Sequence, residues 1–513
     1  MEESFNPTIG KTVLETLTSG MYDDARFIFR EYIQNAVDQI DQAVQLGILS
    51  SKSDGKVEIE IDVEQKRIVI SDNATGVSQK DALQFLGDVA NSQKDSTKQR
   101  GFRGIGRLGG LGYCDRLIFE TSYKDEAVRS KMVLDAKLLK RIIEDSKDTS
   151  DAAAAISIIT SVDKTVEDAD KHYFRVILED VNVGSKVLDI NKVQQYLSMV
   201  APVPFSSSFS YANEIKNHLQ TRNLIVDEYN IVLNNVTLFK AYKDKFNDEN
   251  EDASNIIGVD FVDITNDSQE LLAICWYGYR NNSNVVIPES NIERGIRIRT
   301  KNIALGDEST CKRFFDAERT NLRFIGEIHT VNEGFVPNAR RDYFNENSTC
   351  QQFEENAKKI FTAQNLENRL AQTASKLYNR LQEIKAYQIE REKFMTKKGS
   401  FGNEATEKFH LNKLKEMEKK AVKAIDVIKK IEKKSQDITP VKNLYQNIIG
   451  NNDTTVQPLD SQEAQVSQYD PPTFTKLNTE QEKVVLEIFD IMEDVLDFNT
   501  SEMIKKRIVQ KYN

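Results

Sequence analysis

Residues 26–44 read RFIFREYIQNAVDQIDQAV and predict an amphipathic helix with polar residues along one face. The apolar side chains recur near the helical period of 3.6 residues, with polar residues on the other side. Glu31, Asn35 and Asp38 follow one another at positions i, i+4 and i+7, so they project from one face opposite the apolar stripe. Taken alone, such a triplet indicates only a solvated polar helix face.

A second motif lies at the end of an expected strand, where residues 68–77 read IVISDNATGV. Apolar residues alternate with charged ones over residues 57–63, and the polar turn at 64–66 separates this run from the next, which predicts an antiparallel hairpin. The second strand runs into Asp72, four residues before Gly76. This arrangement can place a carboxylate at the floor of a binding site beneath a closely approaching backbone. An Asx turn is the alternative.

The third motif is a glycine-rich loop at residues 101–112, GFRGIGRLGGLG, in front of an expected strand at 116–122. The backbone N–H groups of such a loop can surround a phosphate, with Arg103 and Arg107 adding positive charge. A Rossmann site is excluded because no parallel βαβ unit precedes the loop. A Walker loop is excluded because no GK[ST] follows it.

In this order, the three motifs resemble the GHKL ATPase superfamily of gyrase, ninety-kilodalton heat-shock chaperones, histidine kinases and MutL. The segments 30–40 (REYIQNAVDQI), 86–96 (LGDVANSQKDS) and 104–122 (GIGRLGGLGYCDRLIFETS) are most similar to the bacterial chaperone type. The resemblance implies an α+β fold, in which a Bergerat-type domain of helices on a mostly antiparallel sheet holds ATP beneath a mobile lid. A middle α/β domain would follow it.

The resemblance also implies a role for each motif residue. Glu31 would be the general base that activates water, Asn35 would hold Mg²⁺ through the phosphate oxygens, and Asp38 would support nucleotide contacts. Asp72 would accept a hydrogen bond from the adenine amino group, with Gly76 leaving room for the base, which predicts ATP over GTP. The residues expected to surround the phosphates are Gly104, Gly106, Gly109 and Gly112, with Lys94 adding charge from the lid.

Two positions depart from the family's pattern. Ala74 stands where the aspartate motif usually has a glycine, and alanine is tolerated there only if its φ is negative. Residues 92–94 read SQK where the chaperone lid has Ser-Gly-Thr-Lys, which leaves Lys94 the weakest of the assignments.

The second domain is expected to complete the site with a basic residue. Residues 334–344 (GFVPNARRDYF) resemble the chaperone loop whose arginine reaches the γ-phosphate, and alignment by Asn338 and Asp342 selects Arg341, with Arg340 as the near alternative. Lys301 is a rival, because gyrase-like and MutL-like relatives use a lysine in a comparable loop. An exposed surface charge is the other interpretation of either residue.

Composition shifts predict the domain organisation. Heptad spacing on both sides of a turn at 397–403 favours an antiparallel helical hairpin or coiled coil. Thr479 and Glu482 form an expected capping box, and the polar residues 145–170 read as an insertion loop. The expected parts are an ATP-binding domain at 1–190, a middle α/β domain at 191–350, the hairpin at 351–440, a linker at 441–476 and C-terminal helices at 477–513.

Composition also limits the classes of function. No stretch of the 513 residues approaches the roughly 20 apolar residues of a membrane span, so we expect a cytoplasmic chain. Four scattered cysteines and four scattered histidines indicate neither a disulfide framework nor a zinc site. A net charge of −11 argues against nucleic-acid binding by the whole surface.

Two functions therefore remain. The first is an ATP-driven switch, in which a homodimer closes on a protein client and reopens after hydrolysis. The second is a GHKL ATPase that engages DNA or acts in anti-invader defence, favoured by the lysine-rich residues 411–435 and by a C-terminal third unlike a chaperone dimerisation domain. A nucleotide-binding scaffold without hydrolysis comes third, and Glu31 argues against it.

Overall fold

The structure is a computed structural model, and its described part divides into two compact units, Met1–Tyr279 with Val285–Glu367, and Arg280–Asn284 with Asn368–Asn513. Within the described residues, no helix has both the length and the apolar character needed to cross a membrane. The residues described are 8–20, 24–87, 106–182, 186–246, 254–280, 285–362, 366–399, 401, 404–435, 439–450, 452–467, 473–496 and 498–513.

The first unit contains an eight-stranded sheet in the order β5-β4-β3-β6-β2-β1-β7-β8. All neighbouring strands are antiparallel except β1 and β7, which are parallel. The predicted hairpin is β1 and β2, paired with Ile59 opposite Ile70. The bounds are β1 Lys56–Asp62, β2 Arg67–Asp72, β3 Arg116–Ser122, β4 Val128–Asp135, β5 Thr160–Val166, β6 Tyr173–Glu179, β7 Asn230–Leu233 and β8 Val236–Thr237.

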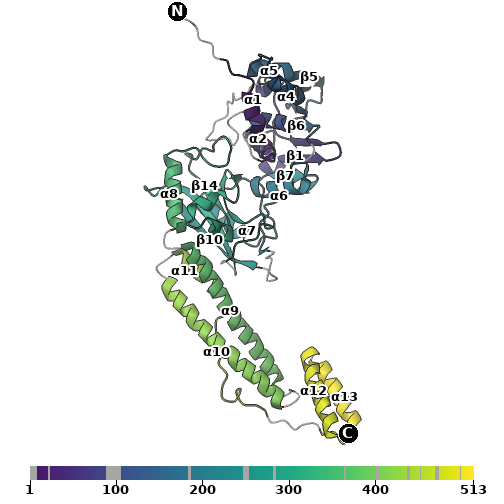
Figure 1. Ribbon diagram of the computed structural model, residues 1–513, viewed down its shortest axis with the longest axis vertical. Helices are drawn as coiled ribbons and strands as arrows, with labels where there is room; N and C mark the ends of the chain where they lie inside the picture. The colour runs from purple at the N-terminus through teal and green to yellow at the C-terminus, as the bar shows by residue number, and fades with distance from the viewer. Residues whose placement is uncertain are drawn as a thin grey trace, which may run out of the picture. The chain divides into compact units, whose positions relative to one another are not determined.

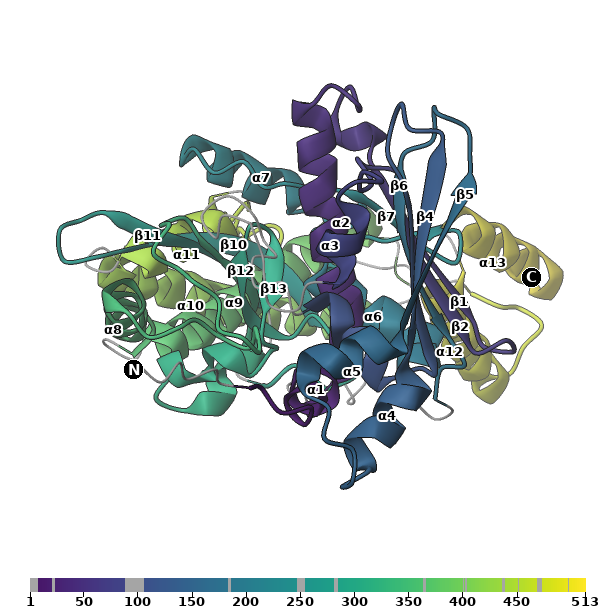
Figure 2. The same ribbon diagram turned by 90° about the horizontal axis from the view of Figure 1, so that it is seen from above.

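Helices pack on one face of this sheet. The side chains of these helices and of the strands form one apolar core. Figure 2 shows the sheet nearly edge-on, with these helices on the same side. The opposite face carries only a small apolar cluster around Ile118 and Ile177. The helices are α2 Phe27–Gln45, α4 Ala136–Glu144, α5 Ala152–Ile159 and α6 Ile190–Val200, with the shorter α1 Val13–Glu15 and α3 Ala82–Gly87 nearby.

The second sheet of the first unit has the order β13-β12-β14-β11-β10-β9 and packs around Trp276. Strands β12 and β14 are parallel, although β13 follows β12 through a tight antiparallel turn. The bounds are β9 Lys245–Phe246, β10 Ser254–Thr265, β11 Leu271–Arg280, β12 Gly295–Thr300, β13 Ile303–Leu305 and β14 Ile325–Thr330, with helices α7 Ala212–Thr221 and α8 Ser348–Thr362.

The second unit is helical. α9 (Leu366–Lys397) and α10 (Glu404–Ser435) run side by side as the predicted hairpin (Figure 1), with a buried seam of residues such as Leu377, Leu381 and Leu414. The remaining helices are α11 Thr439–Ile449, α12 Thr479–Val495 and α13 Phe498–Tyr512.

The structure confirms the predicted α+β class, but several details differ. Residue 190 does not separate the two sheets, because β7 and β8 return to extend the first one. The expected loop at 145–170 contains α5 and β5, since its Ala-Ile run buries Ala155 and Ile156 in the core.

Two further details differ in the second unit. The capping box lies one residue earlier than predicted, on Asn478 and Gln481, because Thr479 is already helical. Most of the expected linker is also ordered. Residues 452–467 lie along the hairpin, where the Tyr387 hydroxyl donates to Gln457 O at 2.7 Å and Arg391 pairs with Glu463 at 2.7 Å.

Candidate functional site

Glu31 lies on α2 and is only 6% exposed, so its carboxylate has little contact with water. The Nε atom of Arg341 is 2.9 Å from Glu31 Oε1, and that of Arg30 is 3.7 Å from the same oxygen. The Arg341 contact is close in distance, yet Oε1 has no partner that meets hydrogen-bond geometry. The structure therefore brings a charge from the distant 334–344 segment onto the expected general base, without a well-aligned hydrogen bond.

Arg30 fixes that segment to α2. Its guanidinium donates to the backbone oxygens of Arg340 and Arg341, each at 3.3 Å. The Arg340 side chain is exposed, whereas that of Arg341 is buried. Sequence reasoning missed Arg30, and its only signal was its position beside Glu31 in an otherwise apolar stretch.

The Arg341 turn is held in an uncommon conformation. Asn338 N donates to Tyr343 O at 2.9 Å, and the Asn338 side-chain amide donates to Asp342 at 2.5 Å. Arg341 itself has a φ of 54°, a left-handed value that non-glycine residues seldom adopt. Such strain persists only where the surroundings fix it, and it concentrates at functional sites.

The glycine motif forms the 3₁₀ turn η3 (Gly106–Gly112), which packs on the N-terminal half of α2. A Cβ added at Gly106 would overlap Glu31 Oε2, so a larger residue there would displace the Glu31 carboxylate. Gly109 is buried in the same turn, and Gly112 ends it half-buried. Gly104 and Lys94, also expected around the phosphates, lie outside the described residues.

Asp72 ends β2 as a buried carboxylate. Burial raises its pKa from 3.8 to about 7, although backbone hydrogen bonds from Ala74 and Phe174 act in the opposite direction. Ala74 N donates to Asp72 Oδ1 at 3.0 Å, which is the Asx-turn contact considered from sequence. The carboxylate has capacity for further donors, because each oxygen can accept more than one hydrogen bond.

The loop after β2 is tied to the C-terminal half of α2. Thr75 donates from its hydroxyl to Gln39 Oε1 at 2.5 Å. Gly76 has a φ of 66°, and a Cβ there would overlap the backbone oxygen of Ser122. Glycine is thus required here because the backbone of Ser122 lies so close. This reason is independent of the room that Gly76 was expected to leave for adenine. Ala74 is not among the residues with positive φ, as expected from its side chain.

The polar side of α2 therefore contacts two separate segments, η3 with Arg341 and the loop after Asp72. Glu31 meets η3 and Arg341 near its start, and Gln39 meets the Asp72 loop eight residues later, about 12 Å along the helix axis. Between them, Asn35 is half-buried and Asp38 is buried. An elongated ligand with a base at one end and phosphates at the other fits this order.

Buried polar atoms along α2 test whether a nucleotide and Mg²⁺ fit. Within the part of the chain that the structure describes, three buried atoms of this helix find no hydrogen-bond partner, namely Arg30 Nε, Glu31 Oε1 and Gln34 Oε1. This is costly unless a ligand or water supplies one. Gln34 is a further residue that sequence reasoning missed. Among the described residues, no group of three His, Cys, Asp or Glu side chains is arranged to hold a metal ion. Mg²⁺ commonly takes few protein ligands when it binds with substrate phosphates, so Asn35 alone suits such a site.

Lys301, the rival to Arg341, lies at the tip of the turn between β12 and β13. Lys301 and Asn302 have φ values of 49° and 62°, as a two-residue hairpin turn requires. The turn is fixed by Arg299, which donates to Asn302 O at 2.8 Å, and by Asn302, which donates to Asp227 O at 2.6 Å. The direct contact to Glu31 comes from Arg341 instead.

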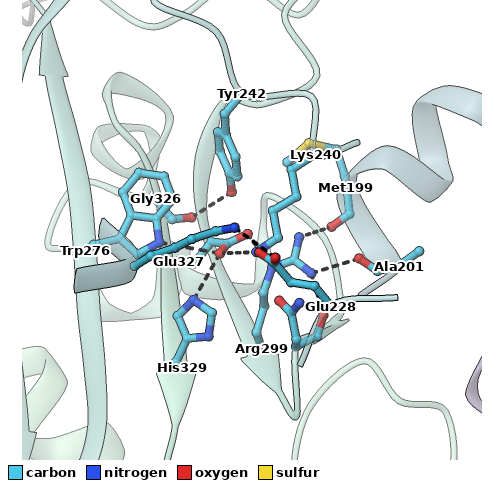
Figure 3. Close-up of polar contacts among 12 residues, drawn as sticks. Met199, Ala201, Glu228, Lys240, Tyr242, Trp276, Arg299, Gly326, Glu327 and His329 are labelled. Carbon is cyan, nitrogen blue, oxygen red and sulfur yellow. Dashed lines mark hydrogen bonds and ion pairs between the residues drawn. The ribbon is translucent and has the colours of Figure 1, made fainter. Parts of the chain in front are cut away.

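Arg299 belongs to a buried charged cluster in the second sheet (Figure 3), where its guanidinium pairs with Glu327. Lys240 lies 2.8 Å and His329 3.0 Å from the same carboxylate. Burial alone would raise the pKa of Glu327, but Arg299 and Lys240 lower it well below its usual value. Arg299 also donates to Met199 O at 2.6 Å, so the cluster holds the C-terminal end of α6.

Part of this chain is similar in sequence to known proteins. A family model described as Histidine kinase-, DNA gyrase B-, and HSP90-like ATPase matches residues 27–166. Chaperone protein HtpG of Polaromonas naphthalenivorans (strain CJ2) is 28% identical over 126 residues, 21% of this chain and 20% of that protein. Chaperone protein HtpG of Orientia tsutsugamushi (strain Boryong) is 32% identical over 93 residues, 17% of this chain and 15% of that protein. The matches thus span a fifth or less of these relatives.

The raised pKa of Asp72 predicts how stability depends on pH in the absence of nucleotide. Because the folded pKa is about 7 and the ordinary value is 3.8, the chain loses stability as pH rises between these values. Asp72→Asn avoids this loss, so we expect it to be more stable than the parent by as much as about 4 kcal/mol at pH 8 and by less at pH 5. Urea unfolding at both pH values measures the difference.

The control for this measurement is Asp170→Asn, at an exposed carboxylate. Its effect should be small at both pH values. An Asp72→Asn advantage that is the same at pH 5 and pH 8 would contradict the raised pKa.

Proposed function

We propose, from the membership of residues 27–166 in the histidine kinase-, DNA gyrase B- and HSP90-like ATPase family, that this chain is an ATP-hydrolysing conformational switch. The observation that carries the proposal is the contact between Glu31, on α2, and Arg341, in the loop at 334–344 of the same unit. A base on the nucleotide-binding helix and an arginine from the second domain are the two groups that phosphoryl transfer to water needs.

Each residue of the proposed site has its own role in binding the nucleotide. Asp72 accepts a hydrogen bond from the adenine amino group and rejects the carbonyl that guanine has there. The backbone of η3 and the amide of Asn35 surround the phosphates. Bound Mg²⁺ would neutralise phosphate charge, and Asn35 would hold it, with Asp38 supporting the nucleotide contacts.

Arg341 has two possible partners during the cycle. Without nucleotide it neutralises the buried Glu31 carboxylate. A γ-phosphate beside α2 offers a larger negative charge and bidentate geometry, so it competes for the guanidinium. Breaking this buried ion pair has a cost, which contacts with the γ-phosphate would offset. Glu31 is then free to take a proton from the attacking water.

The work of the switch is proposed from the relatives' printed name, chaperone protein. We infer that nucleotide binding closes a homodimer on a protein client. The alternative is an ATPase of DNA-engaged or anti-invader type, and one observation favours it. Exposed lysines on α10 lie opposite the buried seam of the hairpin, and they are Lys419, Lys423, Lys430 and Lys433. ATPase rates measured alone, with an unfolded protein and with DNA distinguish the two, because only the true partner should change the rate.

Glu31→Ala should abolish Mg²⁺-dependent ATP hydrolysis while ATP still binds, because the base acts on water and not on the nucleotide. A positioned general base contributes about 10²–10⁴ in rate. The rate of ATP hydrolysis in the variant should therefore be lower than that of the parent by at least the smaller of these factors. Asp72→Asn is the matched comparison, and it should lose ATP binding itself. Hydrolysis by Glu31→Ala at the parental rate would show that Glu31 is not the base.

Arg341→Ala and Lys301→Ala should separate the two candidates for the γ-phosphate contact. We expect Arg341→Ala to slow hydrolysis by up to about 10³, the order found for arginines that stabilise phosphoryl transfer. ADP affinity should not change, since ADP has no γ-phosphate to lose. Lys301→Ala serves as the control. The assignment is wrong if the larger loss appears in Lys301→Ala, and neither residue completes the site if both variants keep the parental rate.

The dimer is expected to form through α12. Val484, Ile488, Ile491 and Val495 repeat at spacings of four and three residues and are 53%, 44%, 63% and 76% exposed, a seam that a second copy can cover. Ile491→Asp should therefore shift the dimer toward monomer in sedimentation at micromolar concentration. Gln510→Asp, at an exposed position of α13, should not. A parental chain that is monomeric under these conditions rules out the dimeric switch.

A further inference from the structure

Tyr32 follows Glu31 on α2, and its side chain joins this helix to the glycine turn η3. The residue is 3% exposed, and its spacing in the sequence puts it among the apolar residues of the helix. Its hydroxyl donates to Arg107 O at 2.9 Å and accepts from Gly110 N at 3.2 Å. One hydroxyl thus binds a carbonyl and an amide of the same turn, three residues apart.

The packing around this hydroxyl is tight. A Cβ added at Gly110 would lie 2.6 Å from the Tyr32 oxygen and 3.0 Å from Leu117, so glycine alone fits there. Gly106, at the start of the turn, lies against the Glu31 carboxylate in the same way. Two consecutive residues of α2 therefore contact both ends of η3.

Burial raises the pKa of Tyr32, so the hydroxyl stays protonated and can donate at neutral pH. The apolar ring alone could fill the space beside Leu117, but it could not bind the two backbone groups. A tyrosine at this position thus adds directional hydrogen bonds to a contact that packing already supplies.

We propose that the Tyr32 hydroxyl is a positioning group for ATP hydrolysis, which fixes the glycine turn relative to the Glu31 carboxylate. The inference rests on the proposed ATPase function. If the turn surrounds the phosphates and Glu31 directs the water, the distance between them decides how often the reacting atoms are aligned. Tyr32 does not touch the nucleotide and acts only through η3.

The test compares Tyr32→Phe with Tyr113→Phe in the full chain. Both changes remove one hydroxyl and keep the ring, and Tyr113 packs its ring on Phe27 at the other end of the turn. We expect Tyr32→Phe to lower kcat by about 10- to 100-fold, because misplacement of about 1 Å can cost 10² in rate. The KM for ATP and the Kd for ADP should stay within about threefold, since Asp72 is untouched. Tyr113→Phe should keep the parental kcat.

Hydrogen exchange provides a readout that does not depend on turnover. Without nucleotide, amides of residues 106–112 should exchange faster in Tyr32→Phe than in the parent, while those of β3 should not change. Tyr32→4-aminophenylalanine keeps a donor toward Arg107 O but is a poorer acceptor from Gly110 N, so it should recover only part of the lost kcat. If Tyr32→Phe does not fold, the same kcat and exchange measurements on the aminophenylalanine variant decide the matter, with an intermediate loss in both expected.

Each outcome has a distinct meaning. An active parent with unchanged kcat in the Tyr32 variants overturns the positioning role, even if exchange becomes faster, because the hydroxyl is then a structural anchor only. Unchanged exchange in residues 106–112 overturns it as well, because the hydrogen bonds then do not hold the turn. A parent that hydrolyses no ATP refutes the proposed function instead.

Discussion

A buried carboxylate needs a compensating positive charge. Several contacts of the first unit serve to hold such a charge beside Glu31. The charge comes from Arg341, far along the chain and from the neighbourhood of a different sheet. Bringing it there requires a strained turn, an anchoring Arg30 and a glycine at residue 106 so that the backbone can approach. Any ligand that competes for Arg341 consequently acts on the second sheet as well as on α2.

Local patterns predicted much of this site. The period of residues 26–44 predicted α2 to within one residue at each end, although Glu31 and Asp38 on its polar side are buried as well, and alternation predicted the β1–β2 hairpin. The family assignment also followed from three short motifs and is confirmed for residues 27–166. These features depend on residues close together in sequence, where periodicity carries the information. The catalytic and binding roles remain predictions, because they depend on a ligand.

Other features had no local signal. Tyr32 fits the apolar stripe by spacing, and only the position of η3 shows that its hydroxyl is engaged. Arg30 gains its role from a loop more than 300 residues away. The pairing of β7 with β1 and the course of residues 452–467 along the hairpin are likewise long-range contacts. Composition alone marked the latter segment as a linker, because Pro, Asn and Ser are typical of loops, and composition does not show whether a loop packs on a neighbouring helix.

The return of β7 to the first sheet affects how the chain can be divided. The polypeptide leaves the first sheet after β6, builds α6 and α7, and comes back to lie parallel to β1 before it enters the second sheet. The two sheets are therefore interleaved in sequence. A cut near residue 190 would remove two strands from the ladder and expose the edge of β1, so neither proteolysis nor genetic recombination at that point would release the first sheet intact. The chain between the two sheets includes β7, which is hydrogen-bonded to β1. A rotation of one sheet against the other would therefore strain these hydrogen bonds, whereas a flexible tether would not oppose it.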